Sequence, residues 1–198
     1  MATLFTIAMT GSQETPPNGS PASGAGIVHW DPETSTASYE IVVRGLDFGP
    51  VRGLPADTAI TADDVTNMHV HEAARGVAGP VIFGQITPAQ DNDDLSVVRL
   101  ETMDVTQGPD GAWIISGAWD PADPAGKSIT AFADALNAAA SGDDLPLYFN
   151  THTTTFPAGE IRGQWVGASL DDGAAPVDWN TIAAVVQANF AQTGSWFL

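Results

Sequence analysis

The sequence predicts an all-β fold: an antiparallel Greek-key sandwich or flattened barrel with one inserted helix and one C-terminal helix. Turn-forming Gly, Pro, Asn and Asp residues recur at short spacing along the 198 residues. The runs between them are rich in β-branched and aromatic residues, and several alternate in polarity with a period of two. The length suits one domain with a small appendage.

The strands follow from these alternating runs, starting at the N-terminus. Residues 4–9 alternate between two faces, and the segment lacks the basic residues that begin a secretion signal. We therefore interpret it as the first strand and expect any export signal elsewhere, for example in the C-terminal tail. Further strands are expected at residues 26–30, 37–44, 65–71, 81–86, 95–105, 113–119, 145–153 and 160–166.

Two segments follow the helical period instead. In residues 128–140 apolar side chains recur at helical spacing, with Ser128 as the N-cap and Gly142 as the stop signal. Residues 179–191 carry a second apolar stripe. We therefore expect a β domain over residues 1–168, followed by a linker and an amphipathic helix over residues 169–198. This C-terminal segment could dock on the β domain, or it could mediate homo-oligomer formation.

The charge balance excludes some partners. The chain has 24 acidic and 6 basic residues, a formal net charge of −18, so it repels nucleic acid and anionic lipid. Without an apolar run of about 20 residues, no membrane span is expected, and without cysteine no disulfide or thiolate site forms. Acidic pairs in predicted loops make weak calcium binding a hypothesis, although Asp91–Asp94 does not match an EF-hand loop.

Three histidines form the one plausible chemical site. His69 and His71 are two residues apart on a predicted strand, so both side chains point to the same face. His152 lies on a later predicted strand. Three imidazoles on rigid strands suit a copper ion, with zinc as the alternative. The competing interpretation is that the three histidines are structural, as we expect for His29.

Four further residues are candidates for supporting this site. Glu72, Asn150 or Glu160 could hydrogen-bond the imidazoles and fix their tautomers. Arg162 shares a strand face with Glu160 and is expected near His152.

Four segments, which follow one another along the chain as they do in the family, resemble the CHRD family, the domain named after chordin. Gly11–Pro17 is similar to its opening GxQExPP, and Tyr39–Leu46 to its third strand. His69–Val81 resembles an HxH strand with the glycines that follow it, although Glu72–Arg75 replaces the first glycine. Asn150–Gln164 resembles the closing N-V-H-T…P-x-G-E-I-R-G-Q. The resemblance implies an extracellular β-sandwich and brings no agreed biochemical activity.

Met68–Glu72 is also similar to the F-H-V-H-E copper-binding strand of copper–zinc superoxide dismutases. This similarity covers five residues. No histidine lies between His71 and His152, so the bridging ligand of a copper–zinc pair is missing.

These observations favour an extracellular or periplasmic metal-binding domain, with copper preferred and redox activity as a further hypothesis. The alternative is a non-enzymatic interaction, matrix or self-assembling module with structural histidines. The chain lacks the G-x-S-x-G and G-x-G-x-x-G motifs, so it offers no sign of a hydrolase elbow or a dinucleotide site. The sequence leaves open whether the domain is an enzyme.

Overall fold

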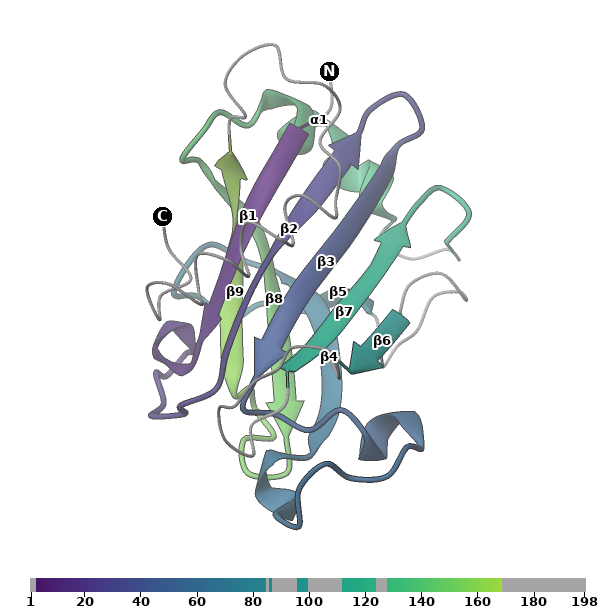
Figure 1. The fold of residues 1–198 in the computed structure, drawn as a ribbon. Coiled ribbons are helices and arrows are strands. Elements are labelled where there is room, and N and C mark those ends of the chain that lie inside the picture. The colour runs from purple at the N-terminus through teal and green to yellow at the C-terminus, as the bar shows by residue number, and fades with distance from the viewer. Residues whose placement is uncertain (1–2, 85, 87–95, 100–111, 124–127, 169–198) are drawn as a thin grey trace, which may run out of the picture. The chain divides into compact units, whose positions relative to one another are not determined.

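The structure is a computed structural model (Figure 1), and it describes residues 3–84, 86, 96–99, 112–123 and 128–168. The chain divides into two compact units, Met1–Ala168 and Ser169–Leu198. The second unit, which contains the helix predicted at 179–191, lies outside the described residues.

The described strands form one antiparallel nine-stranded sheet, which confirms the all-β prediction. Their order in the sheet is β5-β4-β8-β9-β1-β2-β3-β7-β6. The strands are β1 (Thr3–Thr10), β2 (Ser23–Asp31), β3 (Thr36–Arg44), β4 (Val65–Glu72), β5 (Val81–Gly84), β6 (Ser96–Arg99), β7 (Ala112–Trp119), β8 (Asp144–Thr153) and β9 (Ile161–Ala168). Of the strand predicted at 95–105, the described part is β6.

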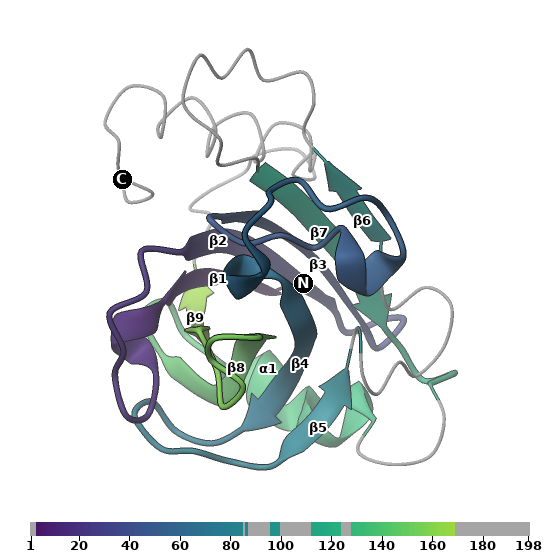
Figure 2. The ribbon, with the colours of Figure 1, turned by 90° about the horizontal axis from the view of Figure 1, so that it is seen from below.

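The sheet is continuous because its first and last strands pair. Leu4 of β1 lies opposite Ala168 of β9, while β1 also pairs with β2 on its other side. Seen along the strands, the sheet curls round on itself (Figure 2). Across the interior, Trp119 Nε1 of β7 donates to the carbonyl oxygen of Gly84 in β5 at 3.3 Å. Of the two predicted shapes, the flattened barrel describes this arrangement.

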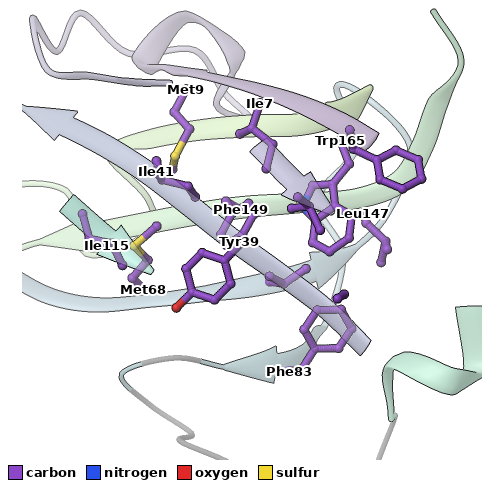
Figure 3. Close-up of a cluster of buried hydrophobic side chains, with 14 of the residues drawn as sticks. Ile7, Met9, Tyr39, Ile41, Met68, Phe83, Ile115, Leu147, Phe149 and Trp165 are labelled. Atoms are coloured by element: carbon purple, nitrogen blue, oxygen red, sulfur yellow. The ribbon is translucent and has the colours of Figure 1, made fainter. Parts of the chain in front are cut away.

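The inner face of the sheet carries the hydrophobic core (Figure 3). In the long strands, such as β1 and β3, alternate residues point inward and are buried, as the period-two pattern predicts. The ring of Trp119 packs 4.6 Å from Tyr39, 5.7 Å from Phe149 and 5.9 Å from Trp165, measured between centroids. Aromatic side chains bury large apolar areas, so this cluster is a major source of the domain's stability.

The helix predicted at 128–140 is shorter and of mixed type. A 3-10 turn covers Ile129–Phe132, and α1 covers Ala133–Ala138. Ser128 is the cap, accepting from Thr130 N, as predicted. The helix ends early because Ala139 is extended, and the Asp143 side chain accepts a hydrogen bond from the Ala140 N–H. None of the helices in the described segments is long and apolar enough to cross a membrane.

The outer face of β4, β8 and β9 is unusually polar for a buried surface. Two segments contribute to its polar contacts: residues 11–20, which follow β1, and residues 73–80, which connect β4 to β5. The buried polar residues on or next to this face are Glu14, His69, Asn150, Glu160, Arg162 and Gln164. A buried polar layer needs hydrogen-bond partners, and its arrangement defines the candidate site.

Candidate metal centre

The pairing of β4 with β8 brings the three histidines together. His69 lies opposite Asn150, and His152 lies opposite Asn67, so His69 and His152 are diagonal neighbours across the two strands. Their Nε2 atoms are 2.9 Å apart. The ring of His71 is 4.7 Å from that of His69 and 6.2 Å from that of His152, between centroids. One ring nitrogen from each histidine lies within 4.8 Å of the other two.

Backbone carbonyls set the tautomers of two of the rings. His71 Nδ1 is 2.7 Å from the carbonyl oxygen of Gly79, and His152 Nδ1 is 3.1 Å from that of Pro157. A carbonyl oxygen only accepts, so each Nδ1 carries the proton and each Nε2 presents a lone pair. His71 Nε2 is buried and has no hydrogen-bond partner among the described residues.

Burial favours the neutral form of His71 and His152. His69 is 6% exposed, while His71 and His152 are half-buried. Burial lowers the pKa of His71 and the hydrogen bond to Gly79 opposes the shift, while the charges of His152 and Arg162 lower the pKa further. Burial likewise lowers the pKa of His152, against the bond to Pro157. Metal ions bind the neutral imidazole, so these shifts favour ligation near neutral pH.

Arg162, which was expected near His152, lies on β9 opposite Asn150 of β8, and His152 is two residues from Asn150 along β8. Its guanidinium carbon is 3.4 Å from the centroid of the Tyr148 ring. Tyr148 stacks on His71, with an interplanar angle of 7° and a centroid distance of 4.8 Å. Because β8 lies between β9 and β4, the phenol ring is held between the guanidinium and the imidazole.

Asn150 contacts a residue that the site prediction did not include, Glu14. Asn150 Nδ2 lies 3.5 Å from Glu14 Oε2, and a Cβ atom placed on Gly159 would come within 2.8 Å of both side chains. Glu14 Oε1 and Asn150 Oδ1 are buried acceptors without a hydrogen-bond partner in the described part of the chain. Burial raises the pKa of Glu14 to about 7, although Arg162 opposes the shift.

The other two predicted support residues are Glu160 and Glu72. Glu160 accepts hydrogen bonds from Ser20 Oγ at 2.6 Å and from Thr153 Oγ1. Thr153 Oγ1 in turn accepts from Phe156 N at 3.1 Å, at the turn that contains Pro157. Glu72 shares the strand parity of Val70 rather than that of His71. The contacts that orient His71 and His152 are therefore made by main-chain carbonyls.

The geometry is close to that of a three-nitrogen metal site. Two nitrogens bound to one tetrahedral ion are separated by about 3.4 Å, given metal–nitrogen bonds of about 2.0–2.1 Å. The ring nitrogens of the cluster are separated by distances from 2.9 Å up to 4.8 Å, a range that includes this value. In the described residues, the acidic pairs Asp63-Asp64 and Asp143-Asp144 form no comparable group of three, and Asp91–Asp94 lies outside them.

The site prediction did not include two side chains, Glu14 and Tyr148, for different reasons. Glu14 is an acidic residue within Gly11–Pro17, and its presence in that motif was the available signal. Tyr148 shares the strand parity of His152, but its stacking on His71 depends on the pairing of β4 with β8. The contacts of the Gly79 and Pro157 carbonyls are made by the main chain, so the pattern of side chains does not predict them.

Comparison with known proteins shows the family. A search of curated proteins and a search of solved structures each gave no match. The chain matches the CHRD domain over residues 5–165, which takes in every described strand except the start of β1 and the end of β9. The three histidines and the polar layer around them all lie within the matched range. The chain therefore belongs to the CHRD domain family.

Proposed function

We propose that this CHRD domain binds one transition-metal ion through His69, His71 and His152, with copper favoured and zinc as the alternative. The observation that carries the proposal is that one ring nitrogen from each of the three imidazoles lies within 4.8 Å of the other two, while the Nδ1 atoms of His71 and His152 face main-chain carbonyls. Imidazole suits both metals, and copper binds nitrogen ligands more tightly than zinc does.

Three protein ligands leave a coordination position open. Water or a small ligand would fill it, as in zinc sites with three protein ligands. A copper ion in such a site could cycle between Cu(I) and Cu(II), which is the basis of the redox hypothesis. We place the domain outside the cytoplasm, in the extracellular space or the periplasm, as the CHRD family suggests.

Metal analysis of the full chain tests the proposal. The protein is dialysed against Cu(II) or Zn(II), and bound metal is measured together with the circular dichroism spectrum. We expect one ion per wild-type chain and none in folded His69→Ala or His152→Ala variants. His29→Ala is the matched control, because His29 lies on β2 outside the cluster. Equal stoichiometry in wild type and His152→Ala would overturn the proposal.

The alternative function is an interaction or self-assembling module with structural histidines. The 2.9 Å contact between His69 Nε2 and His152 Nε2 favours it, because one shared proton would make this contact an ordinary hydrogen bond. Under this alternative, deletion of residues 177–198 changes the oligomeric state measured by light scattering. A monomer both before and after deletion argues against it.

A further inference from the structure

Arg162 is connected to His71 by two separate sets of contacts. The first runs through the segment between β4 and β5. Arg162 Nη1 donates to the carbonyl oxygen of Val77 at 2.8 Å, and Nη2 donates to that of Ala74 at 3.0 Å. Two residues beyond Val77, the carbonyl of Gly79 accepts from His71 Nδ1. The arginine thus holds the segment whose carbonyl sets the His71 tautomer.

The second set of contacts runs through Tyr148. The guanidinium lies over one face of the phenol ring, and the ring stacks on His71. Tyr148 Oη also accepts a hydrogen bond from Gly79 N at 3.2 Å. Both sets of contacts therefore end on the same two residues, Gly79 and His71.

Arg162 has no capacity left for an anion or another ligand at its Nη atoms. Besides the two carbonyls, Nη1 is 3.5 Å from Thr15 Oγ1 and Nη2 is 3.3 Å from Gln164 Oε1. The side chain is 2% exposed. A planar guanidinium can combine several directed donors with a flat stacking surface, which an ammonium group cannot do.

We infer that Arg162 is a positioning residue of the metal centre, fixing the tautomer and plane of the His71 ring through Gly79 and Tyr148 without binding the ion. The inference rests on the proposed function for its importance to metal binding. The His71 tautomer that the inference predicts is a property of the metal-free protein. The role of Arg162 and the proposed metal binding can therefore each be wrong while the other is right.

The test compares Arg162→Lys with wild type by nitrogen NMR of labelled imidazoles in the metal-free protein at pH 8. In wild type, we expect His71 and His152 to carry their protons on Nδ1. In Arg162→Lys, we expect a mixture of tautomers at His71 only, because the Pro157 carbonyl still holds His152. Copper affinity should fall about 10- to 100-fold, as for other losses of outer contacts to metal ligands.

Arg75→Gln is the matched control. Arg75 belongs to the same segment, but its bonds to Asp144 and Gln13 lie at the surface. It should keep the wild-type tautomers and affinity. Gly79→Ala provides a second variant should Arg162→Lys fail to fold, because its Cβ would lie 2.0 Å from the Glu72 carbonyl oxygen and displace the segment. It should reproduce the His71 change.

Two results would overturn the inference. The first is a folded Arg162→Lys protein with wild-type His71 tautomer and affinity. The second is an equal tautomer change at His71 and His152, because that would reveal general loosening and no specific positioning. A wild-type protein that binds no copper or zinc would overturn the proposed function, and the NMR comparison would still decide the role of Arg162.

Discussion

The Nε2 atoms of His69 and His152 lie 2.9 Å apart on neighbouring strands. The hydrogen bond from His152 Nδ1 to Pro157 leaves a lone pair on His152 Nε2. Two facing lone pairs at this distance would repel, so either a proton on His69 Nε2 or a metal ion must lie between the rings. The two proposed functions differ in which of these is present.

Thermal unfolding should distinguish them. A ligand that binds only the folded state stabilises it by about 2.7 kcal/mol at a concentration of 100 times its Kd. For a domain of this size, we expect added copper or zinc to raise the Tm by about 5–10 °C. The shift should be reversed by a chelator and absent in His152→Ala. An unchanged Tm at saturating metal would favour the shared proton.

Replacing Glu14 by Gln should stabilise the protein at pH 8 more than at pH 4.5. The pKa of Glu14 is raised from 4.5 to about 7 by burial, so the folded state binds more protons than the unfolded state between these values. Stability contributed by Glu14 therefore falls as the pH rises through this window. Urea unfolding at both pH values measures the effect. If Glu14→Gln changed the free energy of unfolding equally at pH 4.5 and pH 8, the prediction would be wrong.

Acid should weaken the metal-free protein through His71 and His152. Burial lowers both pKa values below the ordinary 6.5, so the unfolded state binds more protons below that pH. Their contribution to stability is fully present above about pH 6.5 and is lost as the pH falls through the folded-state pKa values. Unfolding is best measured in the Glu14→Gln background, which removes the opposite dependence. Replacing both histidines by Gln should make the free energy of unfolding depend less on pH in this range. An unchanged dependence would show that His71 and His152 are not its source.

Gly159→Ala should be much more destabilising than Gly76→Ala. Both residues have positive φ, +134° and +74°. A Cβ on Gly159 would lie 2.7 Å from Asn150 Oδ1 and 2.8 Å from Glu14 Oε1, whereas one on Gly76 meets nothing within 4 Å. We expect a loss of about 1–2 kcal/mol for Gly76→Ala and of more than about 2 kcal/mol for Gly159→Ala. Equal losses by urea unfolding would show that Asn150 and Glu14 adapt freely.

The local elements were predictable because their signals are local. Alternating polarity placed the strands, and the Ser128 cap placed the start of the short helix. Strand parity also put His69 and His71 on one face. The helix was predicted too long because its period continues through Ala139 and Ala140, whereas Ala139 is extended in the structure and the helix ends at Ala138.

The sequence by itself determined the all-β class, the family and the three histidines as a candidate group. Only the tertiary structure decided that His69 and His152 meet diagonally, because this depends on which strands pair and in which register. It also decided that main-chain carbonyls of Gly79 and Pro157 orient two of the rings. Every residue carries the same main-chain carbonyl, so the pattern of side chains does not predict which carbonyl a distant imidazole will contact.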